Sequence, residues 1–260
     1  MNIDIIELSE RKARFILSGV STAFVNSLRR SITSEVPTLA IDYVNIYDNT
    51  SVLYDEQLAL RLGLIPLKMN RKFLSPDKCK CNEKGCVSCQ ASLTISAEGP
   101  KIIYSEDMVS QDPDVQIVEY RIPIVELKER HKVVVEAVAR IGTGRQHAKW
   151  QAGIACGYKN TPVIMIEDCD LCGNCAEACP REILMMGPHK VNIVDAIDCS
   201  FCKLCEKACN TKAIKVNEDL NSFVMTFETS GAMTAEDLLI EAAETIKQKA
   251  EELGSLLEGF

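Results

Sequence analysis

A cysteine pattern that occurs twice constrains this 260-residue chain more than any other feature. The first copy has the spacing C-x2-C-x2-C-x3-C, and the second copy begins thirty residues later with the same spacing. Neighbouring residues repeat as well, since Asp168 corresponds to Asp198 and Ala178 to Ala208. The copies consist of Cys169, Cys172, Cys175 and Cys179, and of Cys199, Cys202, Cys205 and Cys209. This regularity indicates an internal duplication rather than a chance cluster.

The spacing is typical of a loop that wraps around three corners of a cubic [4Fe–4S] cluster. In two-cluster ferredoxins the fourth cysteine of each run binds the other cluster. We therefore expect a ferredoxin-like module with two [4Fe–4S] clusters. Cluster one uses Cys169, Cys172, Cys175 and Cys209, and cluster two uses Cys199, Cys202, Cys205 and Cys179. Zinc and disulfides are the alternatives, but zinc favours two separated C-x2-C pairs, and disulfides rarely persist in a reducing compartment.

A third group of four cysteines lies in a polar loop and follows the pattern C-x-C-x4-C-x2-C. It consists of Cys79, Cys81, Cys86 and Cys89. Four thiolates within eleven residues close a tetrahedron around zinc and would clip a long loop together. The alternative is four metal-free thiols, which would be prone to oxidation, so structural zinc is favoured. Cys156 stands alone, and we expect it to be a buried, unreactive thiol.

The charge balance argues against a chain that grips nucleic acid by itself. Lys and Arg number 29 against 37 Asp and Glu, which gives a net charge of −8. Proteins that bind DNA directly usually carry a basic face that neutralises phosphates. No run approaches the roughly 20 apolar residues of a membrane span, and no signal peptide is evident. We expect a cytoplasmic protein that contacts other proteins and no membrane.

Hydrophobic periodicity predicts an α+β fold. Alternating apolar residues indicate strands at 3–9 and 13–19, and helical spacing follows from Ser21 or Thr22 to a stop before Pro37. Further expected strands cover 39–46, 93–96, 115–127, 132–141 and 221–228, and further helices cover 55–63 and a long segment that begins at Thr234.

The last predicted helix carries an apolar stripe at spacings of three and four residues. The stripe consists of Leu239, Ala242, Ala243, Ile246, Ala250, Leu253 and Leu257. The pattern by itself leaves open whether it belongs to the core of this chain or to a partner surface.

Several separated motifs resemble the alpha-like subunits of cellular RNA polymerases. They lie at residues 24–30 (FVNSLRR), 35–41 (EVPTLAI), 60–67 (LRLGLIPL) and 146–150 (QHAKW). With the ferredoxin-like insertion, the chain most closely resembles the D-type, alpha-like assembly subunits of archaeal DNA-directed RNA polymerase. The resemblance covers nearly the whole chain, with the motifs in the family's order.

The resemblance implies three domains. Residues 1–46 and 220–260 form a discontinuous dimerisation domain, and residues 47–162 form an inserted mixed α/β domain with the Cys-rich loop 79–89. Residues 163–219 form a ferredoxin-like 2[4Fe–4S] domain. The resemblance also implies a heterodimer with the small alpha-like subunit L, on which the large catalytic and small assembly subunits gather, so that DNA is contacted only indirectly.

The same resemblance makes the apolar stripe a partner surface and directs Asn26, Arg29 and Arg30 toward a large subunit. The expected function is a non-catalytic subunit of DNA-directed RNA polymerase, an enzyme (a nucleotidyltransferase) only as a complex. Polymerisation needs clustered carboxylates for magnesium, whereas Asp168 and Asp170 merely flank a cluster ligand. The clusters would then be structural or redox-sensing. The alternative function is a ferredoxin-type electron-transfer subunit of an oxidoreductase complex, although no flavin or nicotinamide fingerprint is evident.

Overall fold

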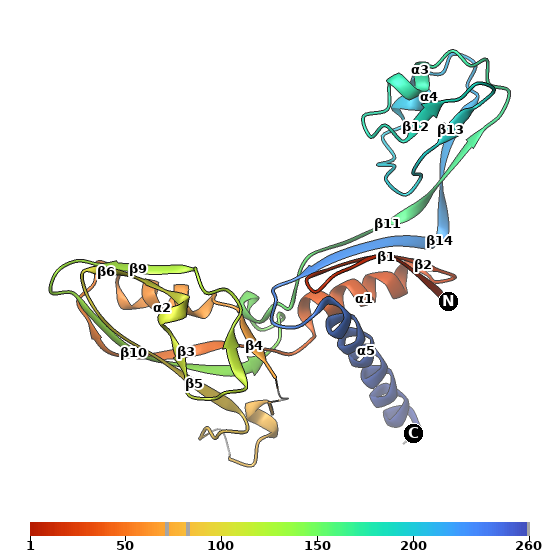
Figure 1. Ribbon diagram of the computed structural model, residues 1–260. Coiled ribbons are helices and arrows are strands. Elements are labelled where there is room, and N and C mark those ends of the chain that lie inside the picture. Colours follow the sequence, from red (N-terminus) through yellow and green to blue (C-terminus); the bar gives the residue numbers. More distant parts are fainter. Residues whose placement is uncertain (71–72, 82–83, 259–260) are drawn as a thin grey trace. The chain divides into compact units, whose positions relative to one another are not determined.

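The structure is a computed structural model that describes residues 1–70, 73–81 and 84–258 (Figure 1). The chain divides into two compact units, each assembled from segments that are far apart in the sequence. The first unit consists of residues 1–7, 14–26 and 157–226. The second unit consists of residues 8–13, 27–156 and 227–260. Helices and strands are mixed throughout, as the sequence predicts.

A four-stranded sheet with the order β1-β2-β14-β11 forms the body of the first unit. Its strands are β1 (Asn2–Leu8), β2 (Lys12–Ser18), β14 (Ile214–Thr229) and β11 (Gly153–Ile166). On β2 the alternate residues Ala13, Phe15 and Leu17 are buried, which is the two-residue period of a strand with one covered face. The backbone N–H of Phe24 donates to Oγ of Ser21 at 3.3 Å, so Ser21 caps the start of α1 (Thr22–Ser34).

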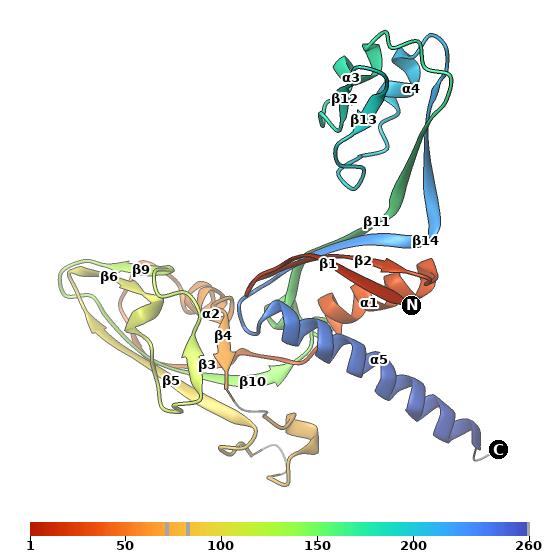
Figure 2. The ribbon, with the colours of Figure 1, turned by 45° about the vertical axis from the view of Figure 1, so that its right-hand side comes forward.

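Beyond this sheet, β11 and β14 continue side by side as a ribbon that leads to the cysteine repeats (Figures 1 and 2). Across the ribbon, the hydroxyl oxygens of Thr161 and Ser222 lie 2.8 Å apart. The repeat segment contains α3 (Asn174–Glu177), α4 (Leu204–Ala208) and a hairpin of β12 (Leu184–Met186) and β13 (Val191–Ile193). One ribbon therefore holds both ends of the repeat segment.

The second unit is built on a sheet with the order β3-β10-β5-β7. Its strands are β3 (Thr38–Asn49), β10 (Lys132–Gly142), β5 (Gln90–Glu98) and β7 (Val109–Ser110). Helix α2 (Asp55–Gly63) packs against this sheet with Leu58 and Leu62 fully buried (Figure 1). Two further antiparallel pairs join β4 (Leu67–Met69) to β8 (Val115–Ile117) and β6 (Lys101–Tyr104) to β9 (Pro123–Leu127).

Helix α5 (Ala235–Glu258) changes character along its length. Thr234 caps its start, since the N–H of Asp237 donates to the threonine Oγ1 at 3.1 Å. In the first turns Ala235, Leu238 and Ala242 are buried, and Oγ of Ser31 donates to the carbonyl of Ala242 at 2.9 Å. Farther along, Leu253, Leu256 and Leu257 are 59%, 67% and 64% exposed. The apolar stripe of α5 therefore belongs to the core at the start of the helix and is exposed to solvent at its end. The buried leucine in the first turn is Leu238, not the predicted Leu239.

Most predicted elements are confirmed, including the helix at 55–63 and the helix that begins after Thr234. The single strand expected at 115–127 is wrong, because this segment forms two strands, β8 and β9, that pair with different partners. Strand β11 was not predicted, since Gly153, Gly157 and Pro162 lower the strand propensity of its sequence. Among the described residues, no helix is long and apolar enough to cross a membrane.

Gly153 on β11 tests how closely this strand packs against α1. A Cβ atom there would lie 2.4 Å from Cγ2 and 2.9 Å from the carbonyl oxygen of the buried Ile32. We expect Gly153→Ala to lower the free energy of unfolding by about 1–3 kcal/mol in urea denaturation, because backbone must shift. Gly157→Ala on the same strand is the control, since its Cβ would meet nothing within 4 Å. Equal stability of the two variants would contradict this packing.

Candidate functional site

The four thiols of the first cysteine group converge just before β5. The Sγ atoms of Cys79, Cys81, Cys86 and Cys89 all lie within 4.8 Å of one another. The separations are 3.5 Å for Cys79 and Cys86, 3.6 Å for Cys81 and Cys89, and 3.8 Å for Cys86 and Cys89. A tetrahedron with zinc–sulfur bonds of about 2.3 Å requires sulfur–sulfur separations of about 3.8 Å. The group could therefore hold a metal ion, as the sequence predicts.

Local turns bring these thiols together. The N–H of Cys89 donates to the carbonyl of Cys86 at 3.0 Å, and the N–H of Cys86 donates to Sγ of Cys89 at 3.3 Å. Gly85 has a positive φ of 84°, and a Cβ atom on it would lie 2.3 Å from Oε1 of Gln90. The same Gln90 oxygen accepts from Nη2 of Arg140 at 3.2 Å. The loop is thus seated on β10 through Gln90, and Gly85 leaves room for that side chain.

The thiols of this group differ in acidity. A backbone hydrogen bond from Ser88 and the neighbouring Cys79 thiol lower the pKa of Cys86 to about 7. Burial raises the pKa of Cys89 to about 12. Metal ions bind the thiolate form, so protons compete with the metal at each cysteine. Metal binding at this group should release protons at neutral pH and weaken as the pH falls.

The two cysteine repeats share an unusual backbone. Three pairs of equivalent positions have left-handed φ angles. These are Leu171 and Phe201 (62° and 58°), Gly173 and Lys203 (83° and 56°), and Glu182 and Lys212 (54° and 55°). A left-handed residue other than glycine costs roughly 1–2 kcal/mol and persists only where its surroundings impose it. The two loops therefore have a common shape that the cysteine spacing alone did not reveal.

Thiols come together across the repeats. Burial raises the pKa of Cys175, and the nearby thiols of Cys169 and Cys209 raise it further. In the other loop, burial raises the pKa of Cys205, and the thiols of Cys199, Cys179 and Cys202 add to the effect. The third cysteine of each run therefore has the last cysteine of the other run nearby, Cys209 beside Cys175 and Cys179 beside Cys205. This donor set and arrangement fit two cubic iron–sulfur clusters that each take one ligand from the opposite repeat.

Hydrogen bonds point at the sulfur atoms of these cysteines. The N–H of Leu171 donates to Sγ of Cys169 at 3.4 Å, and the N–H of Ala213 donates to Sγ of Cys209 at 3.2 Å. The hydroxyl of Thr211 lies 3.4 Å from the Cys209 sulfur and lowers its pKa. Such bonds favour the thiolate that a metal cluster requires. Asn210, where ferredoxins commonly have proline, does not prevent this turn.

The repeat segment has a small apolar core. Nine buried residues form it, and four of them are cysteines. The other five are Ile183, Leu184, Val191, Ile214 and Val216. A core this small provides limited hydrophobic stabilisation, and ligand bonds of a metal group that binds only the folded state add directly to folding free energy.

Two basic side chains that the sequence analysis did not single out touch the second repeat. Lys159 on β11 donates from Nζ to the carbonyls of Ile197 and Cys199, and Arg14 on β2 pairs with Asp198. No local sequence signal marks these contacts, because both residues lie far from the repeat in the chain.

The motif at 146–150 is a packing device in the second unit. Trp150 is buried and donates from Nε1 to the carbonyl of Arg140 at 2.9 Å. Nζ of Lys149 lies 4.3 Å from the centre of the Trp150 ring and 3.0 Å from Oδ1 of Asp42. The motif therefore fixes this turn against β3 and β10.

Cys156, which we expected to be buried, is only partly buried in the structure. Burial nevertheless raises the pKa of its thiol to about 11, which keeps the thiol unreactive at neutral pH.

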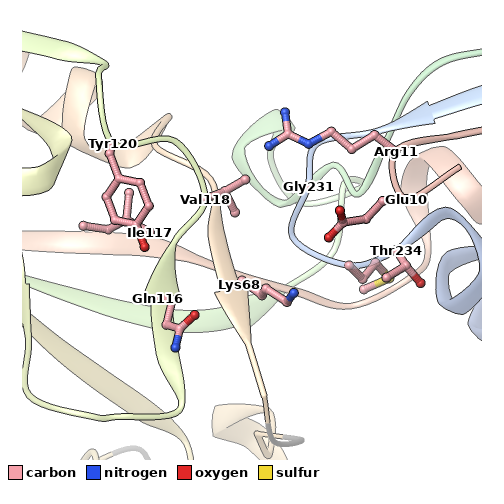
Figure 3. A pocket seen from close by; sticks show the side chains of 10 residues that line it. Glu10, Arg11, Lys68, Gln116, Ile117, Val118, Tyr120, Gly231 and Thr234 are labelled. Carbon is pink, nitrogen blue, oxygen red and sulfur yellow. The ribbon is translucent and has the colours of Figure 1, made fainter.

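A polar hollow lies where the turn at Glu10 and Arg11 meets the β4–β8 pair and the segment that precedes α5 (Figure 3). Its volume is about 200 Å³, below the roughly 300–1,000 Å³ of typical ligand pockets. Arg11 pairs with Glu119 at 2.6 Å, and Gly231 leaves room for Val118. We interpret the hollow as a junction between elements of the second unit and assign it no ligand.

Exposed apolar side chains occur on several elements, and β1 and the end of α5 each carry a group of them. On β1 every residue is exposed, including Ile3, Ile5 and Ile6. On α5 the exposed leucines lie in the last two turns. Within the predicted polar face of α1, Arg30 is exposed, whereas Asn26 and Arg29 are partly covered. These apolar surfaces have the character of protein contacts.

Comparison with known proteins agrees with these observations. Residues 14–250 match the family described as the RNA polymerase Rpb3/Rpb11 dimerisation domain. The chain is 54% identical over 262 residues to DNA-directed RNA polymerase subunit Rpo3 of Methanosarcina acetivorans, covering 99% of this chain and 98% of that protein. It is 44% identical over 258 residues to the Rpo3 subunit of Archaeoglobus fulgidus, covering 98% and 97%. The D-type name that the motifs suggested was wrong, because these relatives bear the name Rpo3.

The four-thiol geometry of residues 79–89 leads to a metal-content prediction. We expect purified full-length protein to contain about one equivalent of zinc, and Cys81→Ala to lose it, because three thiolates do not close the tetrahedron. Zinc is measured by inductively coupled plasma mass spectrometry after gel filtration. Cys156→Ala is the control, since Cys156 lies outside the group. Zinc retained in Cys81→Ala, or absent from the unaltered protein, would contradict the assignment.

Proposed function

Because the chain belongs to the Rpo3 family of DNA-directed RNA polymerase subunits, which shares the Rpb3/Rpb11 dimerisation domain, we propose that it is a non-catalytic assembly subunit of that enzyme. It pairs with a small Rpb11-like partner, the alpha-like subunit L, in the cytoplasm. The heterodimer is the platform on which the large catalytic subunits and small assembly subunits gather. DNA is reached only through the complex.

The observation that carries this proposal is the half-covered helix α5. Its first turns pack on α1 through Ala242 and Ser31, while Leu253, Leu256 and Leu257 face solvent in the single chain. Covering each leucine contributes about 1.5–3 kcal/mol, so this end of α5 favours a partner helix. An uncovered apolar surface of this kind is consistent with the dimerisation-domain family that residues 14–250 match.

The catalytic magnesium ions of the polymerase belong to other subunits in this proposal. Polymerisation uses carboxylates gathered around metal ions. Within the part of the chain that the structure describes, the group of metal-ligating side chains that converges is the four-thiol set of residues 79–89. Thiolates suit structural zinc rather than magnesium.

We divide the chain by role into three domains. Residues 1–46 and 220–260 serve dimerisation, and residues 47–162 form the inserted domain with the zinc loop 79–89. Residues 163–219 form the ferredoxin-like domain with two [4Fe–4S] clusters. This division differs from the two compact units, because β11 and β14 run without interruption from the sheet into the repeat segment.

The cofactors in this proposal are one structural zinc and two [4Fe–4S] clusters. Cys79, Cys81, Cys86 and Cys89 bind the zinc. Cluster one is bound by Cys169, Cys172, Cys175 and Cys209, and cluster two by Cys199, Cys202, Cys205 and Cys179. The proximity of Cys209 to Cys175 and of Cys179 to Cys205 supports the crossed arrangement.

The clusters first of all hold the repeat segment folded. The small core, four of whose nine buried residues are cysteines, supports this role, because loss of metal removes ligand bonds from both repeats at once. Exposure to oxygen, or a shortage of iron, would then loosen the segment and weaken docking of a large subunit, so that the structural clusters would also act as a sensor. The electron-transfer alternative rests on the paired clusters alone, whereas the family match spans residues 14–250.

The exposed end of α5 leads to a test of the partner surface. Co-expressed with the small partner, the unaltered chain should elute as a one-to-one complex in gel filtration. We expect Leu253→Glu with Leu257→Glu to weaken the heterodimer by about two orders of magnitude, because covering two leucines in the interface contributes about 3 kcal/mol or more.

Ser255→Glu is the matched control, since it adds a charge to the same turn on the opposite side of the helix. Circular dichroism establishes that both variants stay folded. Unchanged affinity of the double-leucine variant would contradict the dimerisation role of α5.

Crossed ligation leads to a prediction for iron content. The unaltered protein, purified without oxygen, should carry about eight irons, and Cys172→Ala or Cys209→Ala about four. The Cys172/Cys209 double variant should still carry about four, because both residues bind cluster one. The Cys202/Cys209 double variant should carry none. If Cys209 were a ligand of cluster two, the results of the two double variants would be exchanged.

A further inference from the structure

The two clusters differ in the charges fixed beside them. At the second repeat, Nζ of Lys159 donates to the carbonyl of Ile197 at 2.6 Å and to that of Cys199 at 2.7 Å. Between these residues, Asp198 accepts from Nη2 of Arg14 at 2.5 Å. Two cations, Lys159 on β11 and Arg14 on β2, therefore bond to residues 197–199. The last of these residues, Cys199, is a proposed ligand of cluster two. We name Lys159 and Arg14 the cationic anchor.

The anchor is held in place and partly shielded from water. The Arg14 side chain is 26% exposed and the Asp198 side chain 46% exposed. Lys159 is also partly covered, both of its hydrogen-bond acceptors are uncharged backbone carbonyls, and the nearby Asp198 carboxylate is paired with Arg14. Partly covered charges are screened less by water and salt than exposed ones. The positive charge of Lys159 therefore remains effective at the neighbouring cluster.

The first repeat has no equivalent of the anchor. Asp168 occupies the position of Asp198, yet within the described residues it forms no ion pair or side-chain hydrogen bond. Glu167 and Asp170 add two more negative charges around Cys169. Inside the loop, the second repeat has Lys203 where the first has Gly173. Around the first three cysteines of each run, the surroundings of cluster one are thus acidic, and those of cluster two are not.

Beyond the third cysteine of each run, the distribution of charge is reversed between the two repeats. Glu177 and Glu182 follow the first run toward Cys179, while Lys207 and Lys212 occupy the same positions around Cys209. All four side chains are exposed. Water and salt weaken the influence of exposed charges, so the partly covered anchor outweighs them.

Reduction of a [4Fe–4S] cluster adds one electron and hence one negative charge. A fixed cation nearby stabilises the reduced form, and net charge around a cluster is one of the factors that set its potential. We propose that the cationic anchor makes cluster two the cluster of higher potential, so that an electron added to the protein resides there first. This inference rests on the proposed assignment of the clusters to the eight cysteines.

The first measurement compares proteins that retain one cluster each. Full-length chain is purified with its small partner without oxygen, as Cys172→Ala to leave cluster two and as Cys202→Ala to leave cluster one. Each is titrated with dithionite in the presence of redox mediators, and the reduced cluster is followed by electron paramagnetic resonance. Cluster two should be reduced at the higher potential. Equal potentials, or the reverse order, would overturn the inference.

The second measurement removes the charge of the anchor. In the Cys172→Ala protein, Lys159→Met should lower the equilibrium constant for reduction about tenfold, which corresponds to about 59 mV for one electron. In the Cys202→Ala protein the same change should alter the equilibrium constant for reduction of cluster one by less than about twofold. Lys215→Met is the matched control, because it removes the same charge from an exposed position on β14. An equal shift from both lysine variants would overturn the role of the anchor.

Arg14→Gln is a second test, to be used if the Lys159→Met protein does not retain cluster two. It keeps both Lys159 hydrogen bonds, removes one cation and leaves Asp198 without its ion-pair partner, so it should lower the potential of cluster two. An unchanged potential would count against the anchor. Iron content separates the two levels of failure: about eight irons with no effect of the anchor variants overturns this inference alone. Absence of iron from the unaltered protein overturns the cluster assignment and this inference with it.

Discussion

The pairing of β2 with β14 is the contact on which the rest of the first unit depends. It joins residues near the two ends of the chain, and the N–H of Gly19 donates to the carbonyl of Asn221 at 2.8 Å where they meet. The entropic cost of closing a loop grows only slowly with its length, so long insertions between paired strands are tolerated. Once this sheet exists, β11 and β14 extend from it as a ribbon and fix both ends of the cysteine repeats.

The repeat segment and the loop at 79–89 solve the same physical problem. Each is too short of apolar residues to be ordered by burial alone, and each gathers thiols where a core would otherwise lie. In the loop the sulfur atoms stand at tetrahedral spacing. In the repeats they are spread over two loops of the same left-handed backbone shape. Metal ligation would then couple folding of these segments to the supply of iron, zinc and reducing conditions.

Duplication made two similar loops, and the surrounding structure made them unequal. Lys159 and Arg14, which extend from strands of the sheet and its ribbon, bond to residues 197–199 of the second loop. An assembly subunit with two unequal clusters would respond to its surroundings in two steps rather than one. In the proposed arrangement, the strands of the β1-β2-β14-β11 sheet would thus also affect the chemistry of cluster two.

The sequence by itself determined most of the elements and the chemistry of the thiol groups. Strand and helix periods predicted α2, β10 and α5, and cysteine spacing predicted the three thiol groups, because these signals are local. The tertiary structure decided what local patterns do not encode: the long strand β11 despite its glycines and proline, the division of α5 into a buried and an exposed half, and the contacts of Lys159 and Arg14. These features depend on partners more than thirty residues away, and short-range periodicity carries no information about such distances.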